Sequence, residues 1–189
     1  SESGLSSTLI GSKSGFKFSS TDLDKTLSNE EINTVVVVSR HDTHAELVKK
    51  SLIYKKNIFV EKPLAINKHE LNEIKNLYYS LDDAPQLMVG FNRRFAPQVQ
   101  KMHDLLSSVN APKSLIITVN AGFIPKDHWT QDPFVGGGRI IGECCHFIDL
   151  MRFLVDQKIV SVSGKSIVAG SSKTITEDRS SITLGFDDG

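Results

Sequence analysis

The chain has 189 residues, which fits one domain or two small ones, and 39% of its residues are hydrophobic. Its 22 basic and 22 acidic residues cancel to a formal net charge of zero, so no nucleic-acid or acidic-membrane partner is expected. No apolar run approaches the roughly 20 residues of a membrane span. The only two cysteines, Cys144 and Cys145, are neighbours, which rarely bridge each other. A reduced, cytoplasmic protein is therefore predicted.

The N-terminal stretch gives weak structural signals. Residues 1–15 are rich in Ser and Gly, with weak helical character over residues 5–10. The segment 16–20, FKFSS, is predicted as a short strand. The segment 28–32, SNEEI, is typical of a capped helix start, because Ser28 is followed by Glu31 three residues later.

From residue 34 the sequence alternates between strand and helix patterns. The run TVVVVS at 34–39 is continuously apolar rather than alternating, which predicts a strand covered on both faces. Further strands are predicted at 57–62 and 86–92, and helices at 44–56, 67–81 and 96–109. The alternation predicts right-handed βαβ crossovers and a parallel sheet.

The pattern changes in the second half of the chain. The segments 113–123, 158–168 and 179–186 partly alternate, and a glycine-opened helix is predicted at 136–155. These segments predict an open, largely antiparallel sheet. The expected fold class is α/β, with a partial Rossmann-like parallel sheet in residues 1–95 and an α+β substrate domain in residues 96–189.

Polar residues follow the three predicted parallel strands, in the segments 39–44, 61–63 and 92–95. Ligands of open parallel sheets bind at these carboxyl ends, so the three segments are expected to line one crevice. Pro63 restricts the backbone of Lys62 and so fixes the direction of its ammonium group. Lys62 would then polarise a reacting oxygen. The alternative is that Glu61 and Lys62 form a solvated strand end.

The predicted helix at 136–155 carries a second candidate group. Glu143, His146 and Asp149 are spaced three apart and would lie along one stripe. A neighbouring carboxylate raises the pKa of an imidazole, and such an imidazole near Lys62 could exchange an alcohol proton. The alternative is a satisfied buried histidine, with Asp149 paired to Arg152.

Other motifs have both a functional and a structural interpretation. Arg93 and Arg94 would grip an anionic substrate group or remain solvated. Trp129 would wall the substrate pocket or only pack. A zinc site at Cys144, Cys145 and His146 is rejected, since neighbouring helical side chains diverge and structural zinc prefers spaced ligand pairs. No metal is therefore expected, and GGGRIIG has the wrong spacing for a dinucleotide-binding turn.

Four motifs together carry a family resemblance: VVVVSRHDTHAELVKKSL, NIFVEKPLA, LMVGFNRRFAP and GGGRIIGECCHFIDL. Their order resembles the Gfo/Idh/MocA family of sugar and cyclitol oxidoreductases. The last motif resembles the subgroup fused to a zinc-dehydrogenase-like region. The resemblance implies a nicotinamide-binding Rossmann domain followed by a substrate domain, an NAD or NADP cofactor, and a sugar, sugar nucleotide or cyclitol substrate.

The resemblance also implies site residues. Lys62 matches the family lysine that binds substrate and polarises its oxygen, and His146 matches the acid/base histidine. Gly142 stands where the family carries an aspartate, and whether Glu143 replaces that carboxylate stays open. We expect cofactor contacts from Ser39, Arg40, His41, His44, Glu61, Lys62 and Pro63. Substrate contacts are expected from Lys62, Arg93, Arg94, Trp129 and Asp149. His44 is also expected to have a capping or packing role.

No glycine-rich GxGxxG turn precedes the first parallel strand. The sequence is therefore interpreted as a fragment of a longer oxidoreductase that by itself is inactive and binds NAD(P) weakly. The strand at Val35 to Val38 would have an open flank, which predicts a homo-oligomer formed through the open sheet. The alternative function is a non-catalytic binding or oligomerisation module that retains the fold.

Overall fold

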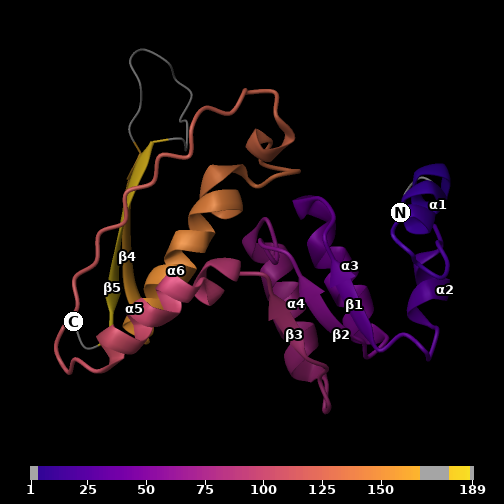
Figure 1. Ribbon diagram of the computed structural model, residues 1–189, viewed down its shortest axis with the longest axis horizontal. Coiled ribbons are helices and arrows are strands. Elements are labelled where there is room, and N and C mark those ends of the chain that lie inside the picture. Colours follow the sequence, from indigo (N-terminus) through magenta and orange to yellow (C-terminus); the bar gives the residue numbers. More distant parts are fainter. Residues whose placement is uncertain (1–3, 167–178, 188–189) are drawn as a thin grey trace.

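The computed structural model describes residues 4–166 and 179–187. A three-stranded and a two-stranded sheet lie apart along the long axis, with two helices, α5 and α6, between them (Figure 1). The N-terminal helices lie beyond the three-stranded sheet at the opposite end from the two-stranded sheet (Figure 1). The expected fold class is confirmed.

The elements follow the chain in this order. The helices are α1 (Gly4–Lys13), α2 (Leu23–Leu27), α3 (His41–Ile53), α4 (Lys68–Ser80), α5 (Pro97–Ser107) and α6 (Cys145–Val155). The strands are β1 (Thr34–Val37), β2 (Asn57–Val60), β3 (Leu87–Val89), β4 (Ile159–Ser166) and β5 (Ser180–Phe186). Short turns of helix are η1 (Asn92–Phe95), η2 (Trp129–Gln131) and the π-helical η3 (Ile140–Cys144).

The first sheet is parallel, in the order β1-β2-β3, as its βαβ pattern predicts. Helices α3 and α4 cover one face, and the core lies between them and the sheet. Its fully buried members are Val37, Ala45, Val48, Leu52, Ile58, Val60 and Ile74. Burial of the valine, leucine and isoleucine side chains among them contributes about 1.5–3 kcal/mol each. This core fixes where the strands end, and therefore where Lys62 lies.

Helix α4 begins where its sequence predicts. The Asn67 side chain accepts a hydrogen bond from Glu70 N at 2.9 Å, and Glu70 Oε2 accepts one from Ile66 N at 3.1 Å. The first bond satisfies a backbone donor that the first helical turn leaves free, and the second binds the residue before the N-cap to that turn. The loop between Lys62 and α4 is thereby held from its far end.

The expectation that β1 is covered on both faces is wrong. Val36 is 62% exposed and Val38 is 68% exposed, on the face away from α3. No described residue pairs with the free edge of β1. A continuous apolar run specifies a strand, but the covering of its second face depends on elements elsewhere in the fold.

Two N-terminal predictions are also wrong. Residues 16–20 form no strand. Ser28 does not start a helix: it ends α2, whose start is capped by the Asp22 side chain accepting from Lys25 N at 3.0 Å. The helix starts at the Asp22 cap rather than at Ser28, because the helix after Asp22 buries the apolar residue Leu27. The helical character predicted at 5–10 is confirmed by α1.

The second sheet is smaller than expected. Strands β4 and β5 pair antiparallel, which confirms two of the predicted strands. Positions 167 and 168 of the predicted segment lie outside the described residues. Residues 113–123 form no strand, and Ile116 on them is 91% exposed. Alternation alone does not make a strand, because a strand also needs a hydrogen-bonding partner, and the described chain offers this segment none.

The helix predicted at 136–155 is confirmed in its C-terminal part and modified at its start. Gly137 and Gly138 have φ values of 78° and 77°, a conformation that favours glycine. The chain then forms the π-helical turn η3 before α6 begins at Cys145. A π turn inserts one extra residue per turn, so side-chain directions here differ from those of a regular α-helix.

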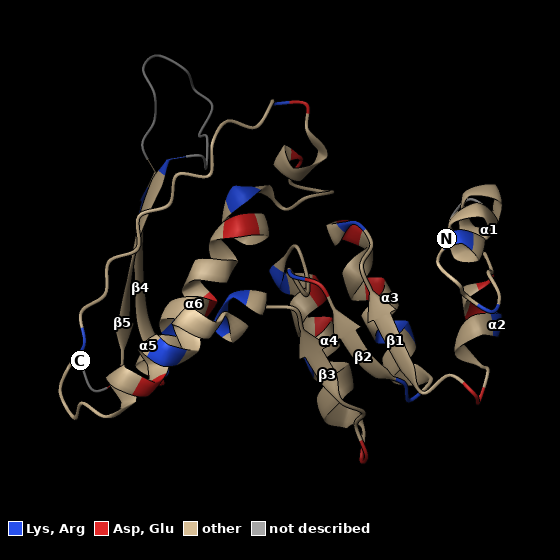
Figure 2. Ribbon diagram, in the orientation of Figure 1, with Lys and Arg blue, Asp and Glu red and all other residues tan. Residues whose placement is uncertain are grey.

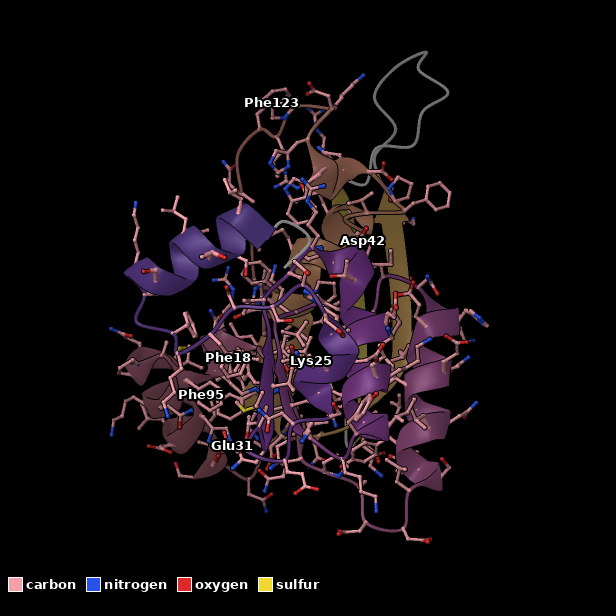
Figure 3. All side chains as sticks on the ribbon, turned by 90° about the vertical axis from the view of Figure 1, so that its right-hand side faces the viewer. Phe18, Lys25, Glu31, Asp42, Phe95 and Phe123 are labelled. Atoms are coloured by element: carbon pink, nitrogen blue, oxygen red, sulfur yellow. The ribbon has the colours of Figure 1, made fainter. Side chains whose placement is uncertain are left out.

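Basic and acidic residues are interspersed along the ribbon rather than separated into two regions (Figure 2). In Figure 3, Phe123 lies at the top of the view and projects outward. Asp42, in the first turn of α3, lies below it. Asp42 N donates to Val135 O at 3.1 Å, so this end of α3 is joined to the same loop region. Among the helices described here, none combines the length and apolarity that crossing a membrane requires.

Candidate functional site

Lys62 lies just beyond β2, at the carboxyl end of the sheet. Glu61 N donates to Val37 O at 2.9 Å, so strand pairing continues to the residue before Lys62. The Lys62–Pro63 peptide is cis. Lys62 Nζ donates to Gly142 O at 2.6 Å and lies 3.8 Å from Glu143 Oε1. The ammonium is therefore held against η3, and its side chain is only 15% exposed.

His146 enters the same region from the first turn of α6. It is 7% exposed, and its Nδ1 is buried without a hydrogen-bond partner. The ring meets the Phe91 ring edge-on, with centroids 6.3 Å apart. A buried polar atom without a partner costs about 1–3 kcal/mol, so an unpaired imidazole nitrogen here marks a place where a ligand would improve the hydrogen bonding.

The pKa of His146 is lowered from its ordinary value. Burial is the main cause, and the positive charges of Lys62 and Arg93 act in the same direction. Glu143 and Glu61 oppose the change less strongly. The neighbouring carboxylate Glu143 does act to raise this pKa, as expected, but burial and two cations outweigh it and the net change is downward. The imidazole is neutral at pH 7 and can accept a proton.

Glu143 faces Lys62 rather than forming a stripe with Asp149. The carboxylate and the ammonium face each other although they come from different halves of the chain. Gly142, the preceding residue, is buried and offers only its backbone carbonyl to Lys62. The Lys62–Glu143 pair gives the site one positive and one negative group beside a neutral imidazole.

The end of β1 is tied to the end of β2 by His44. This side chain is fully buried, with Nδ1 2.7 Å from Pro63 O and Nε2 3.0 Å from Ser39 O. Ser39 Oγ lies 2.6 Å from Thr43 Oγ1. These contacts support the packing role expected for His44, since its ring joins the two loops that follow the strands.

His41 joins the end of β1 to the triple-glycine segment. Its Nδ1 lies 2.8 Å from Gly136 O, and its ring meets the Trp129 ring edge-on at 4.9 Å. Position 136 accepts only glycine, because a Cβ there would lie 2.4 Å from the α-carbon of Thr130. Burial is the main cause that lowers the pKa of His41. Arg40 lies over the Trp129 ring, with Cζ 5.8 Å from the centroid.

An open hollow of about 660 Å³ lies beside this group. It is lined by Arg40 and by residues 126–129 and 131–135. Lys62 and His146 do not line it. The Lys62 ammonium contacts the Gly142 carbonyl and the Glu143 carboxylate instead. The hollow is connected to the group around β1 through Trp129, which lines it and contacts the His41 ring.

Arg94 and Asp149 join η1 to α6. Arg94 Nε donates to Asp149 Oδ2 at 3.1 Å, and its Nη2 donates to Oδ1. The alternative pairing of Asp149 with Arg152 is wrong. Arg93 takes another position, with its Cζ 4.4 Å from the Phe147 ring centroid. Both arginines thus bind α6, which holds His146 in place relative to the sheet.

Replacing Arg94 by methionine is expected to lower the free energy of unfolding by about 2 kcal/mol. The Asp149 side chain is only 9% exposed, so the variant leaves a nearly buried carboxylate without its bidentate partner. Urea denaturation of the variant measures the change. Lys101→Met, at an exposed position of α5, is the control and is expected to change stability by less than about 0.5 kcal/mol. Equal stabilities of the two variants would contradict the structural role of the pair.

The two cysteines have little reactivity in this environment. Neither forms a disulfide. Burial raises the pKa of Cys145 to about 11 and also raises that of Cys144. Within residues 4–166 and 179–187, no three His, Cys, Asp or Glu side chains lie close enough to bind a metal ion. Burial therefore disfavours the thiolate form, which is the nucleophile.

Apart from the Arg94–Asp149 pair, the site residues predicted from the sequence lie mainly in two groups. Lys62, Glu143 and His146 converge where the two halves of the chain meet, with Glu61 and Arg93 close enough to affect the His146 pKa. Ser39, Arg40, His41, His44 and Trp129 gather around the end of β1. Sequence reasoning missed Phe91 and the carbonyls of Gly136 and Gly142, since a backbone carbonyl leaves no residue-type signal.

Two family models cover most of the chain. Residues 7–91 match the oxidoreductase family with an NAD-binding Rossmann fold, and residues 111–189 match the GFO/IDH/MocA C-terminal domain. The chain is 26% identical over 178 residues to an uncharacterized oxidoreductase, YrbE, of Bacillus subtilis. It is 28% identical over 141 residues to inositol 2-dehydrogenase of Rhizobium meliloti. The matches cover 92% and 73% of this chain.

The matched regions are 51% and 41% of those relatives, so the chain spans about half the length of the curated relatives it matches. The fold is shared with myo-inositol dehydrogenase of Lactobacillus casei, solved with NAD(H) and myo-inositol, at a TM-score of 0.79 and 20% identity. That likeness covers 100% of this chain and 55% of the solved one. Levoglucosan dehydrogenase, solved with NADH and levoglucosan, gives 0.76 at 19% identity, over 98% and 53% of the two chains. By its two matching models and its fold, the chain belongs to the Gfo/Idh/MocA family of oxidoreductases.

Proposed function

We propose that the protein carrying this chain is an NAD-dependent oxidoreductase that interconverts a secondary alcohol and a ketone on a sugar or cyclitol. The convergence of Lys62 and His146 is the observation that carries this proposal. The residues come from different halves of the chain, and Lys62 is held by a carbonyl 80 residues away. Relatives named inositol dehydrogenases support the substrate class.

Lys62 would bind and polarise the reacting oxygen. Its ammonium has donors beyond the one given to Gly142 O, since a lysine carries three. Partial burial strengthens its attraction for the partial negative charge that an alcohol oxygen gains as it loses its proton. Glu143, 3.8 Å away, would balance this charge and keep the ammonium positioned beside η3.

His146 would accept the alcohol proton. In the oxidation, the C–H bond of the carbinol breaks with its electron pair, the O–H bond releases a proton, and a C=O double bond forms. NAD+ would supply the acceptor for the hydride. The neutral imidazole of His146 takes the proton and becomes imidazolium, and in the reduction it returns that proton to the alkoxide.

The residues present fit the nicotinamide side of such a cofactor. The segments after β1 and β2 place hydroxyl, imidazole and ammonium groups at the carboxyl edge of a parallel sheet, where dinucleotides bind. The unpaired Nδ1 of His146 lies in the same region. Ser39, Arg40, Glu61 and Pro63 are the residues we propose to line the cofactor. The sequence contains no GxGxxG turn, so these residues would meet the nicotinamide end rather than the phosphates.

A test is hydride transfer by the intact protein, followed as nicotinamide absorbance over a panel of myo-inositol, scyllo-inositol, levoglucosan and sugar nucleotides. Turnover with at least one polyol is expected, with NAD+ and NADP+ compared in parallel. An intact protein that binds nicotinamide but turns over none of the panel, in either direction, would favour the non-catalytic binding module. Gly142, which brings no side chain to the site, is the feature that favours this second candidate.

We further propose a division between residues 1–95 and 96–189, and a cytoplasmic location. The division is supported by the limits of the two family models, which end at 91 and begin at 111. The location is supported by two free thiols, which persist in reducing compartments.

We propose that β1 is also an assembly surface. Its exposed valines and its unpaired edge form a template for a strand of another copy.

The chain expressed alone is therefore expected to self-associate with rising concentration. Val36→Lys with Val38→Lys is expected to shift the mass toward monomer, because lysines blunt an apolar edge. Light scattering after size-exclusion chromatography measures this, and Leu71→Lys on the exposed side of α4 is the control. A monomer at every concentration would contradict the proposal.

A further inference from the structure

His41 is a buried histidine beside Lys62 with one ring nitrogen bound to a carbonyl and the other left for a ligand. It is 8% exposed and begins α3, directly after the end of β1. Its Nδ1 faces the Gly136 carbonyl at 2.8 Å, and a carbonyl oxygen only accepts hydrogen bonds. The proton of the neutral ring is therefore on Nδ1, and Nε2 carries a free lone pair.

No side chain or carbonyl in the described chain hydrogen-bonds to Nε2 of His41. In the described residues, His146 Nδ1 is the only fully buried side-chain nitrogen or oxygen without a hydrogen-bond partner. Nε2 of His41 also has no partner, so it is not fully buried. Nε2 therefore keeps contact with space that a ligand can enter. An acceptor in this position has a defined tautomer, because Gly136 fixes which nitrogen carries the proton.

Gly142 brings His41 and Lys62 together. Lys62 Nζ donates to the Gly142 carbonyl at 2.6 Å. A Cβ added to the same residue would lie 3.5 Å from Cε1 of His41 and 3.8 Å from its Nδ1. The imidazole thus occupies the space into which any longer side chain at position 142 would extend. Lys62 and His41 are separated by a single glycine.

His41 also contacts the wall of the neighbouring hollow. Its ring meets Trp129 edge-on at 4.9 Å, and Trp129 lines the hollow. The charged and titratable groups that act on His41 are Lys62 after β2, Glu143 on η3 and His44 on its own helix. Burial and the Lys62 charge lower the pKa of His41, which keeps the imidazole neutral and accepting at pH 7.

We propose that His41 is a substrate-binding residue that determines specificity, and that its Nε2 accepts a hydrogen bond from the hydroxyl next to the one held by Lys62. This inference rests on the proposed function and narrows its substrate class to vicinal diols. Lys62 donates a hydrogen bond to the reacting oxygen, and His41 accepts one from the neighbouring hydroxyl. A substrate that lacks that hydroxyl would leave a largely buried acceptor unpaired. Its kcat/KM would therefore be much lower than that of the diol.

The test uses the intact protein with NAD+ and the polyol on which it is most active among myo-inositol, scyllo-inositol and levoglucosan. His41→Phe keeps a flat ring against Trp129 but removes the acceptor, and it is expected to raise KM at least tenfold while kcat changes less than threefold. His41→Gln retains an accepting oxygen and is expected to stay within about threefold of the wild-type KM, because the amide replaces the lost lone pair. His69→Gln on the exposed side of α4 is the control.

A pH series separates substrate binding from a purely structural role. In the wild type, KM is expected to rise as pH falls below 6.5, because protonation of Nε2 turns the acceptor into a donor. The His41→Gln variant should lose that rise, since its amide does not titrate, and should retain the acid loss of kcat caused by His146.

The possible results are distinguishable. If His41→Phe keeps the wild-type KM, or His41→Gln keeps the acid rise, the role of His41 is refuted while the proposed function stands. If the wild type turns over no polyol, the proposed function is refuted, and the role of His41 toward a substrate is refuted with it.

Discussion

Replacing Lys62 by methionine in the intact protein is expected to lower kcat/KM by about 10²–10³-fold. Methionine fills a similar volume but brings no charge and no donor to the reacting oxygen. The loss should occur mainly in kcat, because the ammonium is proposed to bind the charge that develops during the reaction rather than the neutral alcohol. Initial rates of NADH formation across a range of substrate concentrations separate kcat from KM.

The control for Lys62 is Lys56→Met. Lys56 is also largely buried and also donates to a backbone carbonyl, that of Asn29 at 2.9 Å, but it lies at the opposite end of β2. Lys56→Met is expected to lower stability by about 1–3 kcal/mol with kcat within about threefold of the wild type. Activity of Lys62→Met within a few-fold of the Lys56→Met level would show that the Lys62 ammonium serves only to hold Gly142.

The second large effect is expected from His146→Asn, which should lower kcat by about 10²–10⁴-fold. Asparagine retains polarity and much of the shape but cannot take up a proton. The pKa of His146 lies below its ordinary value, so the wild-type base is neutral at pH 7. The rate of alcohol oxidation should therefore stay level near neutral pH and decline only as pH falls below 6.5. In the reverse direction the protonated imidazole is needed, so ketone reduction should gain from acid over the same range.

Rate–pH profiles of the wild type and of His146→Asn measure this dependence. The variant should lack the acid decline in kcat for oxidation, while His69→Gln, a change at an exposed histidine, should keep the whole wild-type profile. An unchanged acid decline in His146→Asn would assign the titration to another group and would remove His146 from the proton transfer.

The mutual position of Lys62 and His146 explains why both effects are expected to be large. The ammonium lowers the pKa of the imidazole, so neither group interferes with the charge state that the other needs. Arg94 and Asp149 connect η1 to α6, and this connection holds the helix that carries His146 against the strand ends. A change in that ion pair is therefore expected to affect stability first and the geometry between the two halves second.

The sequence by itself determined the parallel sheet and its crossovers. The β-branched run at 34–39 and the helices after it alternate as the strands and helices of a parallel sheet do. The residue types of Asn67 and Glu70 alone indicated the start of α4. The position of Lys62 at a strand end followed from the same local pattern. The short range of these signals is the reason: strand length, helix caps and crossover handedness depend on neighbours in the chain.

Only the tertiary structure decided which groups meet. The contacts of Lys62 with Gly142, of His41 with Gly136 and of Arg94 with Asp149 each join residues more than fifty positions apart, and two of them end on backbone carbonyls that no residue type reveals. Tertiary structure also left one face of β1 bare and gave residues 113–123 no partner strand. Burial then outweighed the upward effect of Glu143 on the His146 pKa, because the desolvation of a charged ring depends on everything packed around it and not on the spacing of one carboxylate along a helix.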